Sequence, residues 1–409
     1  MARYRPHKLC SIARKAGHPI ILVQIGYRLG ALGFAASQDL VSEQAQSLAS
    51  ANNTNGTAAN STIGNYGFVD QRNALKWVQN HIRDFGGDPG NVTAFGVSAG
   101  SASVHYHILT GDPMFDRAIC MSGSAPTLGP LPFERYQNAW QDLCRKTGVE
   151  GETPEARLKK LRAIDPLEIL DNYSTAAMGP MGDGVVLPNS WTFERSNPTR
   201  CKCLIIGDTN IEGIILDGLA RRIKPSQFRR MLSSVLSAAD AVEFDRLFAF
   251  GGDKEQPWES YRDSIRRLLS LMMFQLPNLR IAETFEAASG GKAYLYHFEE
   301  QSPYPGPTFG LSYHGQCALY MHCIENDALP IESQHLAETM AQIWTAFAHG
   351  MVPWEPYTKA KRFMRFGPQG QIALKDMKTD ETRQYDCIEW LKEHFEPMKR
   401  FAQILLNGE

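Results

Sequence analysis

The sequence predicts an α/β protein in which helices flank a parallel or mixed sheet. Short apolar runs of strand length alternate along the chain with longer segments whose apolar residues recur at helical spacing. The chain has 409 residues, of which 43% are hydrophobic and 21% charged, so it can bury a large core. This length fits one large α/β domain or two modest ones, and the composition excludes collagen-like, coiled-coil and wholly disordered chains.

Charge and hydropathy narrow the function classes further. The 42 Lys and Arg residues against 44 Asp and Glu residues give a net charge of −2, without a basic excess for a nucleic-acid backbone. No run approaches the ~18 apolar residues that a membrane-spanning helix needs. The eight cysteines do not cluster as in a secreted disulfide scaffold. We therefore expect no nucleic-acid partner and no membrane span; the oligomeric state is left open.

The N-terminal part of the chain predicts two strands and a helix. Residues 20–27 are apolar almost throughout, which is typical of a strand buried on both faces. Residues 42–63 are rich in small polar side chains and predict a mobile surface insertion. Apolar residues at helical spacing over 69–82 predict a helix, which the glycines of 86–90 end. Residues 92–97 form the next expected strand.

The rest of the chain continues the alternation of strands and helices. Strands are expected at 117–121, 204–206 and 293–298. Residues 225–287 have mostly helical periodicity and predict a helical cap region. Amphipathic helices are expected at 133–146, 155–164, 333–349 and 386–406.

A Gly-x-Ser-x-Gly segment at residues 96–100 carries the strongest chemical signal. It lies between an expected strand and a helical run, which is the context of a nucleophile turn. The first glycine permits a tight backbone approach, the second lets the helix pack closely, and Ser98 stands at the tip. The backbone N–H of Ala99, at the helix N-terminus, can stabilise an oxyanion. The alternative is a glycine-rich turn with an idle serine.

Several segments around this turn resemble the type-B carboxylesterase and cholinesterase-like family. They are residues 27–34, 64–67, 70–72, 85–89 and 115–119. The similarity is dense from residue 20 to residue 126 and patchier beyond. The resemblance implies a single α/β-hydrolase domain over residues 1–409, with a mostly parallel mixed sheet and helical insertions over the active site. It also implies a Ser–Glu–His triad for ester hydrolysis.

The resemblance also assigns the other site residues. Residues 203–213 look like the family's strand-end loop, which makes Glu212 the triad acid, with Asp208 as a nearby competitor. Glu212 could instead be a solvated loop carboxylate. His314, in a Ser-Tyr-His-Gly segment, is similar to the family's histidine and follows the acid, as the hydrolase order requires. Ser124 matches a family serine beside the triad; a purely structural hydroxyl is an equal alternative.

The sequence departs from the family pattern at two places. Val97 occupies the position before the nucleophile, where the family very often has Glu. The family's His-Gly-Gly oxyanion loop, its leading strands and its early disulfide have no counterpart before residue 27. Ala99 is therefore the one oxyanion-hole donor that the sequence identifies, and the loss of one such donor costs about 2.7–4 kcal/mol of transition-state stabilisation.

Two functions follow as hypotheses. The first is a serine carboxylic-ester hydrolase that works through an acyl-enzyme on a small apolar or aryl ester, without a cofactor or a metal. The alternative is a catalytically impaired, truncated hydrolase-fold protein that acts by binding or has no activity. A start at Met1 predicts a cytoplasmic protein; a missing N-terminal segment would favour secretion and make the glycosylation sequons at Asn52, Asn55 and Asn60 credible.

Overall fold

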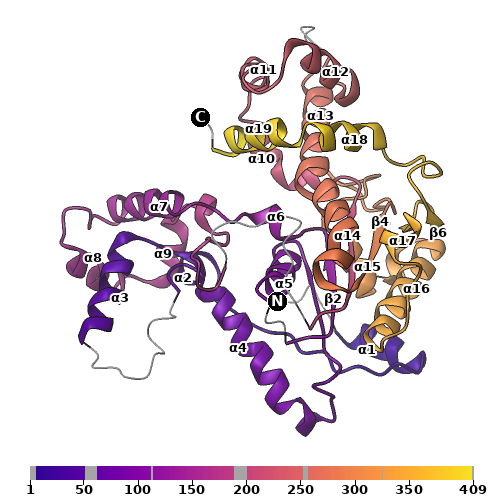
Figure 1. The fold of residues 1–409 in the computed structure, drawn as a ribbon, viewed down its shortest axis with the longest axis horizontal. Helices are drawn as coiled ribbons and strands as arrows, with labels where there is room; N and C mark the ends of the chain where they lie inside the picture. Colours follow the sequence, from indigo (N-terminus) through magenta and orange to yellow (C-terminus); the bar gives the residue numbers. More distant parts are fainter. Residues whose placement is uncertain are drawn as a thin grey trace.

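A sheet of six strands forms the centre of the molecule (Figure 1). The structure is a computed structural model, and it describes residues 6–50, 62–111, 114–187, 200–251, 257–324 and 326–407. The strands lie side by side in chain order; β1 to β5 are parallel and β6 is antiparallel. They are β1 (Thr93–Val97), β2 (Arg117–Met121), β3 (Cys203–Thr209), β4 (Lys292–Phe298), β5 (Phe363–Phe366) and β6 (Ile372–Lys375).

The two faces of the sheet are buried by different helices. On one face, Ala118, Leu204 and Leu295 pack with α5 (Ala99–Leu109) and α14 (Leu276–Ser289). On the other face, Ile205 and Tyr296 pack with α15 (Gln316–Met321) and α16 (Ile331–Ala348). Neighbouring residues of β3 thus face opposite layers, and because both layers are apolar the strand reads as a continuous apolar run.

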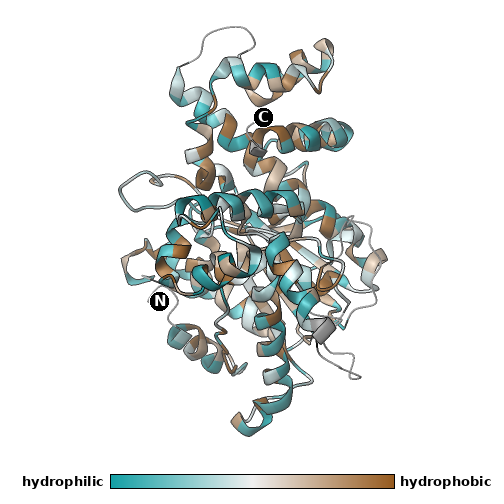
Figure 2. Cartoon of the chain, turned by 90° about the vertical axis from the view of Figure 1, so that its left-hand side faces the viewer, coloured by the Kyte–Doolittle hydropathy of each residue, from teal (hydrophilic) through white to brown (hydrophobic). Residues whose placement is uncertain are grey.

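Two groups of helices extend beyond the sheet as outer lobes, one at the left and one at the top of Figure 1. One lobe has its own apolar cluster, which includes Tyr136, Trp140 and Leu158. Its helices are α2 (Gly30–Phe34), α3 (Gln38–Ser50), α7 (Phe133–Lys146), α8 (Pro154–Leu161) and α9 (Pro166–Asn172). The other lobe contains α11 (Pro225–Ser233), α12 (Ala238–Phe248), α13 (Trp258–Ser270), α18 (Tyr385–Glu393) and α19 (Phe395–Asn407). Figure 2 shows brown and teal residues along these same helices, as expected for amphipathic helices.

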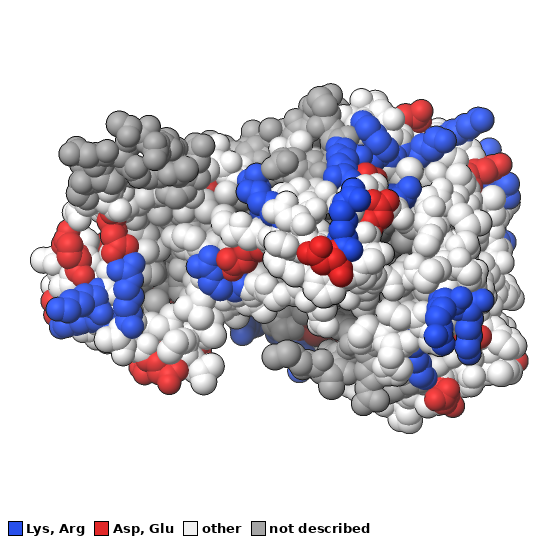
Figure 3. All heavy atoms as spheres, turned by 90° about the horizontal axis from the view of Figure 1, so that it is seen from below, with Lys and Arg blue, Asp and Glu red and all other residues white. Residues whose placement is uncertain are grey.

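The remaining elements are short, apart from α1 and α4. They include α1 (Pro6–Lys15), which packs against α16, then α4 (Tyr66–His81), α6 (Ala125–Leu128), α10 (Asp217–Ala220), α17 (Tyr357–Ala360) and the π-helical η4 (Leu271–Gln275). Four short 3-10 helices complete the described elements: η1 (Ile82–Phe85), η2 (Thr175–Ala177), η3 (Glu212–Leu216) and η5 (Asn326–Ala328). On the face drawn in Figure 3, many Lys and Arg side chains lie beside Asp and Glu side chains. Across the described ranges, none of the helices combines the length and the apolar character needed to cross a membrane.

The prediction of a first strand at residues 20–27 is wrong. The segment is not paired as a strand of the sheet, and Ile21, Val23 and Ile25 are 46%, 38% and 37% exposed. Ile20 and Leu22 pack against the apolar cluster that contains Ile205 and Tyr296, whereas the alternate side chains of the segment stay largely exposed. An apolar run forms a strand buried on both faces only where other elements cover both faces. Those elements come from distant parts of the chain, so the run itself does not show whether they are present.

Two further expected segments are described only in part, and their assigned roles stay predictions. Residues 42–50, expected to be part of a mobile insertion, belong to α3, which packs on α8 and pairs Glu43 with Arg162 at 2.5 Å. Residues 51–61, with Asn52, Asn55 and Asn60, lie outside the described residues. Within the expected cap at 225–287, α14 packs on β3 and β4 and so belongs to the layer that covers the sheet. The single-domain organisation stays a prediction.

A buried histidine in α5 predicts a loss of stability in mild acid. His105 is buried, its Nδ1 accepts a hydrogen bond from the Ala125 N–H at 3.1 Å, and burial lowers its pKa to about 4. Below its ordinary pKa of about 6.5 the unfolded chain binds a proton that the folded chain does not bind. The free energy of unfolding should therefore fall by on the order of 2 kcal/mol between pH 7 and pH 5 on account of this group.

The measurement is thermal unfolding of the chain and of His105→Asn at both pH values. Asparagine keeps an acceptor near the position of Nδ1 but does not titrate, so this variant should lose a clear part of the pH dependence. An identical pH dependence in the two proteins would contradict the assignment.

Candidate active site

Ser98 stands at a strained turn between β1 and α5. Its backbone has φ 57° and ψ −121°, a conformation that costs energy for a residue with a side chain. The Ser98 N–H donates to the Met121 carbonyl at 2.9 Å, and the Ser98 carbonyl accepts the first helical bond from Ala102 at 2.9 Å. The turn therefore ties the sheet edge to the helix start, and it projects the half-buried Ser98 side chain where the strands end.

Glycines around the turn are required to different degrees. A Cβ on Gly96 would lie 2.3 Å from the carbonyl carbon of Gly100, and a Cβ on Gly123 would lie 2.8 Å from the Ser98 carbonyl oxygen. A Cβ on Gly100 would meet no atom within 4 Å outside the helix backbone. The expected role of the first glycine is confirmed, whereas a role for the second glycine in close helix packing is wrong.

The two glycines of the motif should therefore respond differently to the same substitution. Gly96→Ala forces a side-chain carbon onto backbone atoms that cannot move aside, so we expect a loss of at least about 1–3 kcal/mol in unfolding free energy. Gly100→Ala adds a methyl group in open space within a helix, so we expect a change of no more than about 1 kcal/mol, favourable in sign. Urea unfolding of both variants measures this difference; equal destabilisation would contradict it.

Glu212 and His314 are joined by a short hydrogen bond. His314 Nδ1 lies 2.5 Å from Glu212 Oε2, and the other carboxylate oxygen accepts from the Thr209 N–H at 2.6 Å. The Glu212 side chain is fully buried and that of His314 is 10% exposed. Ile211 and Tyr313, the residues before each of them, form a β-bridge, so the backbone itself brings the two loops together.

Asp208, the competing acid, binds other residues and makes no described contact with His314. It is buried at the end of β3, accepts from Arg383 Nη1, and has Oδ1 at 3.1 Å from His297 Nδ1. Burial alone would raise the pKa of Asp208, but Arg383 and His297 lower it to about 2. Glu212 is therefore the carboxylate that holds the His314 ring, and it is not a solvated loop residue.

Ser98 and His314 lie at the same end of the sheet, where the parallel strands have their carboxyl ends. Val97 pairs with Met121 and Met121 with Gly207, so β1, β2 and β3 end side by side. A Cβ on Gly315, the residue after His314, would lie 3.6 Å from a methyl carbon of Val97, the residue before Ser98. Among the described residues no hydrogen bond joins Ser98 Oγ to His314 Nε2; such contacts often tighten only when substrate binds.

Ala99, the predicted oxyanion donor, and Ser124, the predicted supporting serine, differ in their exposure to solvent. Ala99 is exposed and is the first residue of α5, where N–H groups have no partner within the helix. Ser124 is buried, but no hydrogen-bond partner for its Oγ lies among the described residues. Ser122 lies with its Oγ 3.5 Å from the thiol of Cys317, and this packing could not be read from the sequence.

Two groups at the site are not among the residues that the sequence predicts. The Phe274 ring in η4 packs edge-on against the His314 ring, with centroids 5.2 Å apart. The Thr209 N–H fixes the second oxygen of Glu212. A backbone donor leaves no signal in the sequence, and Phe274 sits in an apolar run that is equally consistent with a helix core.

Other candidate sites do not compete with this one. A surface hollow between α3 and α8, lined by Glu43, Lys159 and Arg162 among others, lies in the outer lobe away from Ser98. No group of three or more His, Cys, Asp or Glu residues in the described part of the chain is arranged to hold a metal ion.

Comparison with known proteins identifies the family. The model of the Carboxylesterase family matches residues 54–388. This chain belongs to the carboxylesterase family. The resemblance found in the sequence and the α/β-hydrolase fold are thereby confirmed.

Curated relatives of this carboxylesterase-family chain have several names. It is 30% identical over 396 residues to "Pyrethroid hydrolase Ces2a" of Mus musculus, covering 88% of this chain and 66% of the relative. It is 30% identical over 317 residues to the "Cholinesterase" of Mus musculus, covering 70% and 49%. It is 26% identical over 363 residues to "Lipase 3" of Yarrowia lipolytica, covering 86% and 64%. The chain thus spans between about half and two thirds of the length of these relatives.

Proposed function

We propose that this chain is a serine carboxylic-ester hydrolase that works through an acyl-enzyme on apolar or aryl esters. The observation that carries the proposal is the 2.5 Å contact between His314 Nδ1 and Glu212 Oε2 at the sheet edge where Ser98 stands on its strained turn. The pairing fixes the ring tautomer that leaves Nε2 free to accept a proton. Relatives named as an esterase, a lipase and a pyrethroid hydrolase support the same reaction class.

Each step of the reaction follows from these positions. Ser98 Oγ attacks the ester carbonyl carbon while its proton passes to His314 Nε2, and Glu212 stabilises the imidazolium that forms. The Ala99 N–H stabilises the negative charge on the carbonyl oxygen. His314 then gives the proton to the leaving alcohol oxygen, and the acyl group stays on Ser98. Water gives a proton to His314 Nε2 as its oxygen attacks the acyl carbonyl carbon. The bond to Ser98 Oγ then breaks, Oγ takes the proton back from His314, and the carboxylic acid leaves.

The apolar surroundings of His314 favour an apolar substrate. The buried Phe274 ring packs on the imidazole, and Met272 and Met273 precede it in η4. The Thr127 hydroxyl donates to the Met273 carbonyl at 2.9 Å, which ties η4 to α6 behind the turn. Aromatic and thioether side chains contact apolar or aryl groups well.

The test uses the purified chain, a short-chain p-nitrophenyl ester and a fluorophosphonate probe. We expect ester hydrolysis, and covalent labelling that peptide mapping places on Ser98, because the probe reacts only with an activated serine. A folded chain that neither hydrolyses the ester nor takes up the probe would overturn the proposal. Labelling without turnover would indicate an activated serine whose oxyanion donors are insufficient.

A further inference from the structure

A buried ion cluster lies directly behind the loop that carries Glu212. The Arg383 guanidinium donates through Nε to Glu299 Oε1 at 2.5 Å and through Nη1 to Asp208. The side chains of Arg383, Asp208 and Glu299 are 2%, 0% and 3% exposed. These partners come from the segment before α18 and from the ends of β3 and β4, so the cluster joins three parts of the chain.

The cluster extends into the loop of residues 208–212, here called the acid loop. Arg383 Nη2 donates to the Asp208 carbonyl at 3.3 Å, at the start of the loop. Asn210, inside the loop, donates through Nδ2 to the second oxygen of Glu299 at 2.6 Å and to the Thr382 carbonyl at 3.3 Å. The acid loop is therefore held at its first residue and at its middle, two residues before Glu212.

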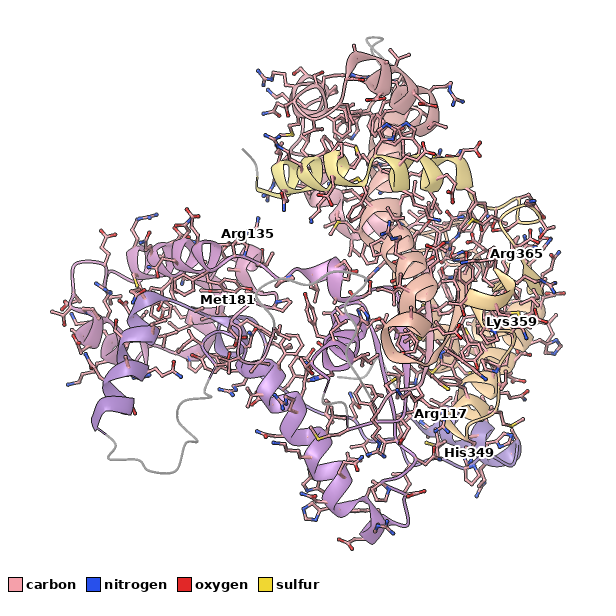
Figure 4. All side chains as sticks on the ribbon, in the orientation of Figure 1. Arg117, Arg135, Met181, His349, Lys359 and Arg365 are labelled. Atoms are coloured by element: carbon pink, nitrogen blue, oxygen red, sulfur yellow. The ribbon has the colours of Figure 1, made fainter. Side chains whose placement is uncertain are left out.

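The far side of the cluster is itself anchored to the sheet. Arg365 Nη1, on β5, donates to Asp380 Oδ1 at 3.0 Å, and the Tyr385 hydroxyl donates to the other oxygen of Asp380 at 2.5 Å. Figure 4 shows Arg365 well away from Arg117 and His349, which lie together at the opposite end of the sheet. The segment that supplies Arg383 is thus fixed at the same carboxyl-terminal end of the strands as the site.

We infer that Arg383, acting through Glu299 and Asn210, positions Glu212 against His314. This role rests on the proposed ester hydrolase, in which Glu212 must keep the imidazole oriented. Arg383 touches neither Ser98 nor His314 in the described contacts, so it is a positioning residue. A small displacement of the acid loop would lengthen the bond between Glu212 and His314, and displacements of about 1 Å at a reacting group cost roughly 100-fold in rate.

The experiment perturbs the link without removing the arginine. Asn210→Asp places a carboxylate opposite Glu299, so at pH 8 the two groups repel and the acid loop shifts. Glu299→Gln in the same chain restores the link, because the amide oxygen can accept from Arg383 while its NH₂ donates to Asp at position 210. We expect kcat to fall at least about tenfold in Asn210→Asp with KM within about threefold, and to recover to within about threefold in the double variant.

A control separates positioning from general destabilisation. Arg157→Met removes an ion pair with Asp39, at 2.7 Å between α8 and α3 in the outer lobe, and should lower Tm without lowering kcat. If Asn210→Asp keeps the kcat of the starting chain, or if Arg157→Met loses kcat in proportion to its loss of Tm, the positioning role is overturned. Failure of the double variant to recover would also contradict it.

A readout that does not need activity separates this inference from the proposed function. The proton between His314 Nδ1 and Glu212 should give a strongly downfield ¹H resonance, identified by its absence in His314→Asn. Even in a chain that hydrolyses no ester, loss of this resonance in Asn210→Asp and its return in the double variant would support positioning. Persistence of the resonance in Asn210→Asp would overturn it.

Discussion

Replacement of Ser98 with alanine is expected to lower kcat for p-nitrophenyl esters by at least about 1,000-fold. The hydroxyl is the group that would form the covalent intermediate, so without it only general stabilisation of a direct water attack remains. Stability should change little, because alanine meets the same backbone strain at φ 57° as serine does. Steady-state kinetics and thermal unfolding of both proteins measure the two effects.

Ser124→Ala is the matched comparison for that result. Ser124 follows Gly123, which lies against the Ser98 backbone, and unlike the half-buried Ser98 it is buried. No partner for its Oγ lies among the described residues, so we expect kcat to stay within about threefold. If Ser98→Ala had the same kcat as the unaltered chain, the hydrolysis would not use Ser98. A large loss in Ser124→Ala would restore the supporting role that the family resemblance implies.

Arg383→Met is expected to produce a large loss of stability, about 3–5 kcal/mol in unfolding free energy. Removing the guanidinium leaves Asp208 and Glu299 buried without their cation. With Arg383 present, the pKa of Asp208 is lowered to about 2, so its ionised form stabilises the fold above its ordinary pKa and this contribution fades as the pH falls toward 2. Without Arg383, burial disfavours the charge on Asp208, so the sign of its contribution reverses. Burial already raises the pKa of Glu299 with Arg383 in place, and the loss of Arg383 should raise it further.

The pH dependence of the stability of Arg383→Met tests this expectation. Arg383→Met should become more stable between pH 8 and pH 5, relative to the unaltered chain, because its buried carboxylates take up protons on acidification. Adding Asp208→Asn and Glu299→Gln should recover part of the loss at pH 8. Arg145→Met breaks two surface ion pairs, with Asp142 and Glu150. The Arg145 side chain is 63% exposed, so the effect should stay within about 0.5 kcal/mol. A loss in Arg383→Met no larger than this would contradict the expectation.

The features that the sequence by itself determined are local ones. The strand, turn and helix around Ser98 follow from adjacent residues, since the glycine at 96, the apolar run before it and the helical run after it act within one short stretch. The helix Phe133–Lys146 occurs with the bounds that its amphipathic periodicity predicts, because residues three and four apart in the sequence share one face of a helix. The order of Ser98, Glu212 and His314 came from the family resemblance.

Tertiary structure decided every question that depended on a partner distant in the sequence. Asp208 and Glu212 are both plausible acids in the sequence. Arg383, 175 residues from Asp208 in the chain, binds the Asp208 carboxylate, which leaves Glu212 to bind His314. Residues 20–27 carry a pattern typical of a buried strand, yet their burial depends on a second layer that local sequence does not encode. Periodicity reports which residues share a face, whereas contacts made across the fold determine what covers that face and which charges are paired.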